Sequence, residues 1–184
     1  VCLNSKLAKV TQNEQGKVLH LTGDQGEQTV TVDEILIGAG RAPNVQNMGL
    51  AQAGVDFDDH KGVTVNDHLQ TTNKKIYAAG DVCLKYKFTH TADASARIVL
   101  RNALFMGRQK ASAMTIPWCT YTQPQIAHVG MYEKQASEEG IEVETFTQPF
   151  REVDRAVTDG EQDGLVKIHL KKGSDKILGA TIVA

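Results

Sequence analysis

The chain has 184 residues, of which 41% are hydrophobic and 23% charged, and its formal net charge is −2. This composition is typical of a soluble globular protein, and the length suffices for one domain or for parts of two. The near-neutral charge argues against a dedicated nucleic-acid-binding protein. No apolar run approaches the roughly 20 residues of a membrane-spanning helix. We therefore expect neither nucleic acid nor a membrane as a partner.

Both ends of the sequence suggest an internal part of a longer polypeptide. The chain starts at Val1 and lacks the basic and then apolar plan of a signal peptide. Its last four residues, Thr-Ile-Val-Ala, are typical of the middle of a strand. We expect residues to be missing on both sides.

The three cysteines, Cys2, Cys83 and Cys119, form neither a redox pair nor a metal-ligand pattern. An odd number of cysteines without a secretion signal predicts reduced thiols in a cytoplasmic protein. We expect small buried or half-buried residues here rather than nucleophiles. No metal site is predicted.

The first part of the chain is typical of antiparallel β-structure. Apolar and polar residues alternate in three predicted strands, at residues 8–11, 17–22 and 28–32. Residues 35–37, Ile-Leu-Ile, form a continuous apolar run, which predicts a strand buried on both faces.

The middle part is less regular and ends in a helix. We expect a helical turn near residues 48–53, a hairpin around 62–65 and a second buried strand at 76–81. Spacing of 3.6 residues between apolar positions predicts a helix from Thr91 to Met106, stopped by Gly107. The apolar positions are Ala92, Ala96, Val99, Leu100, Ala103 and Leu104.

The start of this helix offers several stabilising side chains. Thr89 or Thr91 can cap the first turn, and Asp93 is expected in that turn, where its charge favours the helix dipole.

After residue 112 the pattern changes to that of a separate α+β domain. It predicts a short helix at 133–139 and strands at 142–146, 164–170 and 177–183, with turns at 159–160 and 172–174. Residues 151–156 are interpreted, taken alone, as a solvated charged turn.

Gly80 and Asp81, at the end of the predicted strand 76–81, form a candidate ligand site. Ligands of open α/β sheets bind beyond the carboxyl ends of strands. A glycine there permits close approach, and an aspartate accepts strong hydrogen bonds from hydroxyl groups. The following helix adds free N–H groups and a partial positive charge. The alternative for an isolated Gly-Asp pair is that Asp81 only caps a turn.

Three segments resemble signatures of the class I pyridine nucleotide-disulfide oxidoreductases, the family of dihydrolipoamide dehydrogenase, glutathione reductase and mercuric reductase. Residues 76–82, Ile-Tyr-Ala-Ala-Gly-Asp-Val, resemble its second flavin-binding motif. Residues 38–44, Gly-Ala-Gly-Arg-Ala-Pro-Asn, resemble the signature that ends its nicotinamide domain. Residues 116–130 resemble the opening of its dimerisation domain.

The resemblance implies FAD and NAD(P)H as cofactors. It implies that Asp81 binds the ribityl chain of FAD and that Gly80 permits the approach. It also implies that the backbone of Lys87, Phe88, Thr89 and His90 lies against the pyrimidine end of the flavin. The His90 side chain either contributes or is only a polar residue of the first turn.

Two upstream residues complete the set of cofactor contacts. The resemblance places Gly40 and Arg41 where the backbone passes the nicotinamide cofactor. Arg41 could alternatively pair with an acidic residue of the flavin domain.

Two other segments indicate which branch of the family the chain resembles. Residues 88–97 and 151–156 resemble mercuric-reductase-like members. Cys119 stands where the family often has cysteine, but it is not the redox cysteine, and His128 is expected to be structural.

The family's two GxGxxG motifs and its CxxxxC redox pair do not occur in the chain, and its C-terminal His and Glu would lie beyond Ala184. No catalytic residue is therefore assigned, and we predict that the isolated chain is inactive.

The expected fold is mixed α/β and α+β: a partial, doubly wound FAD/NAD(P)-binding unit followed by a truncated α+β dimerisation domain. Residues 1–45 would end the nicotinamide domain, 46–112 would form the second segment of the flavin domain, and 116–184 would dimerise.

The expected function is that of part of a cytoplasmic, homodimeric FAD-dependent NAD(P)H:disulfide or mercuric ion oxidoreductase. The acceptor would be a small-molecule or protein disulfide, or mercuric ion. The alternatives are a non-catalytic structural and dimerisation module, or a flavin reductase without a redox disulfide.

Overall fold

The computed structural model describes all residues from Val1 to Ala184, which form two compact units, Val1–Arg41 and Ala42–Ala184. Each unit is described by itself. No helix in the chain combines the length and the apolar character that crossing a membrane requires.

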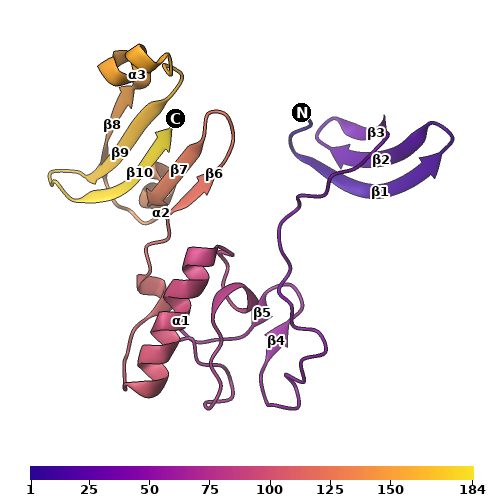
Figure 1. Cartoon of the computed structure of the whole chain (residues 1–184), viewed down its shortest axis with the longest axis vertical. Helices are drawn as coiled ribbons and strands as arrows, with labels where there is room; N and C mark the ends of the chain where they lie inside the picture. Colours follow the sequence, from indigo (N-terminus) through magenta and orange to yellow (C-terminus); the bar gives the residue numbers. More distant parts are fainter. The chain divides into compact units, whose positions relative to one another are not determined.

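The first unit is a three-stranded antiparallel sheet of β1 (Ser5–Asn13), β2 (Gly16–Gly23) and β3 (Gly26–Val32), in that order (Figure 1). Gly16 pairs with Asn13, and Gly26 with Gly23, so each turn joins strands that are adjacent in the sequence. The alternation predicted these strands correctly. Pairing between sequence neighbours requires little loop-closure entropy, so the local pattern suffices.

The predicted strand at residues 35–37 is wrong. The segment from Glu34 to Arg41 contains no regular secondary structure. Leu36 and Ile37 are 99% and 82% exposed. An apolar run becomes a buried strand only where neighbouring strands supply hydrogen bonds and cover both faces, and no strand of this chain pairs with it.

The second unit starts with an irregular segment around a small core. Val45, Val55 and Val63 form this core, and Ile76 and Ala78 pack against it. The predicted hairpin is confirmed, because β4 (Phe57–Asp58) pairs with β5 (Gly62–Val63). At the helical turn predicted near residues 48–53, the Ala53 amide donates to the Gly49 carbonyl, and the segment forms hydrogen-bonded turns without a regular helix.

The predicted strand at 76–81 is also wrong, and its apolar residues are half-buried rather than buried. Tyr77 forms only an isolated bridge with Gln70, and the Ala78 amide donates to the Leu69 carbonyl. The segment then enters the short 3-10 helix η1 (Gly80–Val82). A continuous ladder does not form, because the facing residues 65–71 are themselves folded into turns and single bridges.

Helix α1 (Thr89–Leu104) is confirmed, shifted by two residues from the predicted range. Its buried face differs from the expected one: Thr91, Ser95 and Ile98 are buried, whereas Leu100 and Leu104 are 54% and 68% exposed. After the helix, the Gly107 amide donates to the Arg101 carbonyl. The short 3-10 helix η2 (Ala111–Ala113) follows.

The last part of the chain is a five-stranded antiparallel sheet in the order β6-β7-β10-β9-β8 (orange to yellow in Figure 1). Its strands are β6 (Trp118–Thr120), β7 (Ile126–Gly130), β8 (Val143–Pro149), β9 (Leu165–Lys171) and β10 (Ile177–Val183). The predicted strands and short helix correspond to β8, β9, β10 and α2 (Glu133–Glu138). The sequence did not predict β6 and β7.

The charged segment at 151–156 forms more structure than the solvated turn that its residues alone suggest. It contains η3 (Phe150–Glu152) and the start of α3 (Asp154–Asp159), which ends at Gly160 in the left-handed conformation. Ala156 is 8% exposed and fixes the inner face of α3.

Candidate functional site

Gly80 lies close against the first turns of α1. Its φ is +77°, and a Cβ atom added there would lie 3.0 Å from the Ala92 Cβ. The Gly80 amide donates to Ser95 Oγ at 2.9 Å, and the Ser95 hydroxyl donates to the Ala92 carbonyl at 2.9 Å. Only glycine fits this left-handed backbone at this separation. The contact places Gly80 and Asp81 beside the helix.

The loop between Asp81 and α1 is held by hydrogen bonds among its own residues. The Lys87 ammonium donates to the Asp81 carbonyl at 2.8 Å and to the Leu84 carbonyl at 3.2 Å. The amides of Cys83 and Leu84 donate to the Gly80 carbonyl. These bonds fix the backbone between the Gly-Asp pair and the start of α1.

The N-terminus of α1 has no side-chain cap. The cap residue is Phe88, and neither Thr89 nor Thr91 caps the helix, so that prediction is wrong. Thr91 cannot cap from inside the first turn, where it is 1% exposed. Asp93 lies beyond the first turn and pairs with Arg97 instead, at 2.8 Å. The first N–H groups of the helix thus keep their donor capacity and partial positive charge.

The Thr91 hydroxyl is a buried polar atom without a hydrogen-bond partner. A buried hydroxyl left unpaired costs on the order of 1–3 kcal/mol. An orphaned polar atom of this kind next to an uncapped helix start fits a polar ligand at the site.

Aromatic rings extend along the approach to α1. Tyr86 and Phe88 stack with ring centroids 6.5 Å apart, and Phe88 and His90 stack at 5.3 Å. The His90 ring also donates from Nε2 to the Pro117 carbonyl at 2.8 Å. The His90 side chain therefore has a defined partner.

The structure brings most of the predicted contacts together. Gly80, Asp81 and residues 87–90 lie on one continuous segment around the start of α1. Gly40 and Arg41 belong to the first unit. Gly40 has a φ of +96°, and an added Cβ would meet no atom within 4 Å. Both are exposed.

Two residues of the site were missed by sequence reasoning. Ser95 supplies the hydroxyl that holds Gly80, and Thr91 supplies the buried unpaired hydroxyl. The signal for both was their spacing of four residues, which places them on one helix face.

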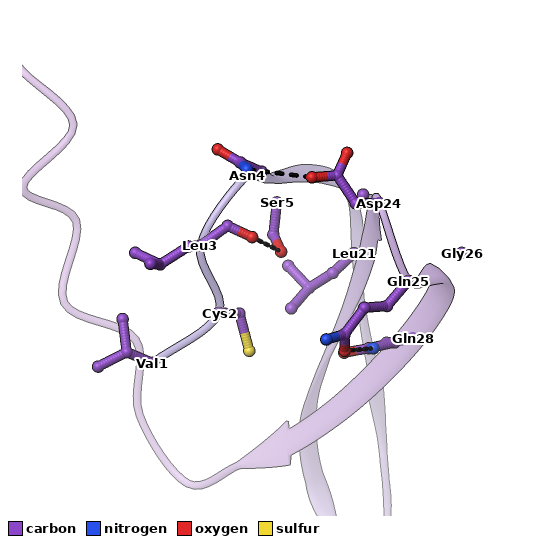
Figure 2. Close-up of a pocket in the computed structure, with 11 residues that line it drawn as sticks. Val1, Cys2, Leu3, Asn4, Ser5, Leu21, Asp24, Gln25, Gly26 and Gln28 are labelled. Atoms are coloured by element: carbon purple, nitrogen blue, oxygen red, sulfur yellow. Dashed lines mark hydrogen bonds between the residues drawn. The ribbon is translucent and has the colours of Figure 1, made fainter.

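Two hollows elsewhere in the chain do not include the predicted site residues. One, of about 350 Å³, lies between the first residues of the chain and the turn at Gly23–Gly26, with Cys2 in its lining (Figure 2). The other, of about 720 Å³, lies beside α2, β9 and β10 and is lined in part by Tyr132, His169 and Thr181.

Buried histidines are fixed beside this second hollow. His169 is 2% exposed, and its Nδ1 lies 2.9 Å from Thr145 Oγ1. Burial lowers the pKa of His169, partly offset by Glu133. His128 contacts Thr181 Oγ1 through Nδ1 and donates from Nε2 to the Gly130 carbonyl, and its ring stacks on Tyr132. His128 is thus held by contacts on both ring nitrogens and on its face, in agreement with the structural role expected for it.

Two family models match the chain. The model of the pyridine nucleotide-disulphide oxidoreductases matches residues 1–96, and the model of their dimerisation domain matches residues 116–184.

Curated relatives agree with these matches. Mercuric reductase of Staphylococcus aureus is 37% identical over 96% of this chain and 32% of its own length. Mitochondrial dihydrolipoyl dehydrogenase of Canis lupus familiaris is 35% identical over 98% of this chain and 36% of its own length. The chain therefore spans about a third of the length of these relatives.

Solved structures show the same fold. The HOCl-induced flavoprotein disulfide reductase RclA of Escherichia coli superposes with a TM-score of 0.83 at 26% identity, covering 100% of this chain and 41% of that one. LpdA of Mycobacterium tuberculosis superposes with a TM-score of 0.84 at 28% identity, covering 98% and 39%. On the combined evidence of matched models, relatives and fold, the chain belongs to the pyridine nucleotide-disulphide oxidoreductase family of enzymes.

Proposed function

We propose that this chain supplies part of a flavin seat and a dimerisation domain to an FAD- and NAD(P)H-dependent oxidoreductase. The observation that carries the proposal is the uncapped start of α1, which contains the unpaired hydroxyl of Thr91 and is joined to the Gly80–Asp81 turn by the loop of residues 82–88. A helix N-terminus without a cap and with a buried orphaned donor is suited to a polar, partly anionic group.

In this proposal each predicted residue has a defined role. Asp81 accepts hydrogen bonds from ribityl hydroxyls. Gly80 has no side chain, so the ribityl chain can come close to the backbone there. The backbone of Lys87, Phe88, Thr89 and His90 faces the pyrimidine end, where the helix dipole stabilises negative charge. The backbone at Gly40 and Arg41 passes close to the nicotinamide cofactor. FAD, when bound, supplies the ring that accepts a hydride from NAD(P)H.

The domain division follows from the same proposal. Residues 1–45 would belong to the nicotinamide-binding domain, 46–112 to the flavin-binding domain and 116–184 to the dimerisation domain. The partner would be a second copy of the chain, and the cellular location the cytoplasm, where the three free cysteines remain reduced. The acceptor would be mercuric ion, as the name of one relative states, or a disulfide, as that of another states.

Titration of the 184-residue chain with FAD tests the flavin seat. Quenching of flavin fluorescence gives the Kd, and Asp81→Ala should weaken binding by about ten- to hundredfold, as expected for loss of charge-assisted hydrogen bonds. Asp163→Ala, at an exposed loop position, is the matched control and should leave the Kd unchanged. Equal Kd values for the Asp81 variant and the unaltered chain would contradict the proposal.

The oligomeric state, measured by sedimentation, together with FAD binding distinguishes this proposal from the alternative of a purely structural module. Residues 116–184 should form dimers, which we expect to see at roughly tens of micromolar chain. A chain that dimerises and does not bind FAD would favour the structural alternative. A monomer at this concentration would contradict the assignment of a dimer interface.

A further inference from the structure

The ring of His90 connects two parts of the second unit that are distant in the sequence. His90 is the second residue of α1, and its Nε2 donates to the carbonyl of Pro117 at 2.8 Å, across 27 positions. The His90 ring also stacks on the ring of Phe88: the two centroids lie 5.3 Å apart, and the angle between the ring planes is 9°. The ring is thus held by both a directional bond and a stack.

The acceptor of this bond is itself fixed to the five-stranded sheet. Pro117 directly precedes Trp118, the first residue of β6, and Trp118 pairs with His128 of β7. The rings of Trp118 and His128 lie 5.8 Å apart, and His128 stacks on Tyr132 at 3.7 Å. The carbonyl that His90 reaches therefore directly precedes β6, the edge strand of the sheet.

The donor of this hydrogen bond, His90, belongs to the proposed flavin seat. The backbone on either side of His90 carries the uncapped N–H groups of α1, and Thr91, the next residue, contains the unpaired hydroxyl. We propose that His90 is a positioning residue, which sets the start of α1 relative to the segment that begins at Pro117 and so couples the flavin seat to the dimerisation sheet. Its coupling to flavin rests on the proposed function above.

The coupling works in both directions. If a group bound at the start of α1 favours the geometry in which His90 meets Pro117, then the same group must strengthen the contact to the sheet. Conversely, removal of the hydrogen bond should loosen the start of α1 and weaken binding there. Since the bond is exposed to solvent, we expect a modest effect, about three- to tenfold in the Kd.

Two substitutions separate the hydrogen bond from the stack. His90→Phe keeps an aromatic ring next to Phe88 but removes the Nε2 donor. His90→Gln removes the ring but keeps an amide donor that can occupy the place of Nε2. The matched control is His68→Phe, because His68 also contacts a backbone carbonyl, that of Gln109 at 2.9 Å, next to the other end of α1.

The first readout needs no flavin. Trp118 is the only tryptophan of the chain and stands next to Pro117. In His90→Phe we expect stronger quenching of its fluorescence by acrylamide and faster amide hydrogen exchange at residues 92–95, whose amides are the first of the helix with carbonyl acceptors, beginning with the Ala92 amide and the Phe88 carbonyl. His90→Gln should restore both, and His68→Phe should change neither. If His90→Phe matches the unaltered chain in both measurements, the positioning role is overturned.

The second readout is the Kd for FAD. His90→Phe should raise it by about three- to tenfold, and His90→Gln should return it towards that of the unaltered chain. If the unaltered chain does not bind FAD, the proposed function fails, while the tryptophan and exchange measurements still decide the role of His90. If FAD binds and His90→Phe leaves the Kd unchanged, the coupling is overturned and the flavin seat stands.

Discussion

The backbone amide of Gly80 donates a buried hydrogen bond of 2.9 Å to the side chain of Ser95, which lies 15 positions later in the middle of a helix. Ser95 is fully buried, with 0% exposure, and its hydroxyl donates a hydrogen bond to the Ala92 carbonyl. One hydroxyl therefore satisfies the amide of the Gly-Asp turn and holds that turn against α1.

Ser95→Ala should lower the free energy of unfolding by about 1–3 kcal/mol, because it leaves a buried amide without an acceptor. Urea denaturation followed by circular dichroism measures the change. Ser137→Ala, on the exposed surface of α2, is the control and should change stability by less than about 0.5 kcal/mol. A Ser95 variant as stable as this control would contradict the role given to the hydroxyl.

Gly80→Ala should destabilise the chain more than Gly140→Ala. Both glycines have a positive φ, +77° and +69°, so both substitutions carry the conformational cost of the left-handed region. Only at Gly80 would the new Cβ lie 3.0 Å from Ala92, whereas nothing lies within 4 Å at Gly140. The difference between the two free energies of unfolding measures the contact, which we expect to contribute about 1–3 kcal/mol.

The stability of the five-stranded sheet should fall as the pH decreases from neutral. Burial lowers the pKa of His169 below its ordinary value of 6.5, so the unfolded chain takes up the proton first. The contribution of His169 is fully present above pH 6.5 and is lost as the pH falls below that value towards the lower pKa of the folded state.

Thermal unfolding between pH 8 and pH 5 measures this effect. His169→Gln, which keeps a polar side chain but cannot titrate, should flatten the dependence in this range. His60→Gln, at an exposed position, is the control and should leave it unchanged. A profile for His169→Gln as steep as that of the unaltered chain would exclude His169 as the cause.

The isolated chain should show no NAD(P)H-dependent reductase activity. Its cysteines are all free, and burial raises the pKa of the Cys83 thiol to about 11, so that it is not a thiolate at neutral pH. The loss of NADPH absorbance with added FAD and a disulfide or mercuric ion measures turnover. Sustained turnover above that of free FAD would refute the prediction.

Sequence reasoning located the helix that follows Gly80 and Asp81, because a 3.6-residue period is a local feature. It placed the Gly-Asp pair at the end of a strand, whereas the pair opens the short 3-10 helix η1. It did not predict which face of α1 is buried. The buried stripe contains Thr91 and Ser95, whose burial depends on Gly80 lying close to the helix, and this contact is not visible in the periodicity of apolar residues.

The strands show the same division between local and distant causes. The hairpins of β1–β3 were predicted because each strand pairs with its neighbour in the sequence. Strand β7 was missed although it pairs with its sequence neighbour β6 as well as with the distant β10, because its one buried residue is the polar His128 and no alternation of apolar and polar residues marks it. Apolar runs at residues 35–37 and 76–81 lack a complete ladder, since composition alone does not supply partner strands.

Leu36 and Ile37 have a practical consequence for work with this protein. They place two large apolar side chains in water, in a segment without regular secondary structure that no strand of the chain pairs with. An exposed apolar run of this kind favours association with another copy of the chain at high concentration. Charged substitutions at these two positions should make the chain easier to concentrate, crystallise and store.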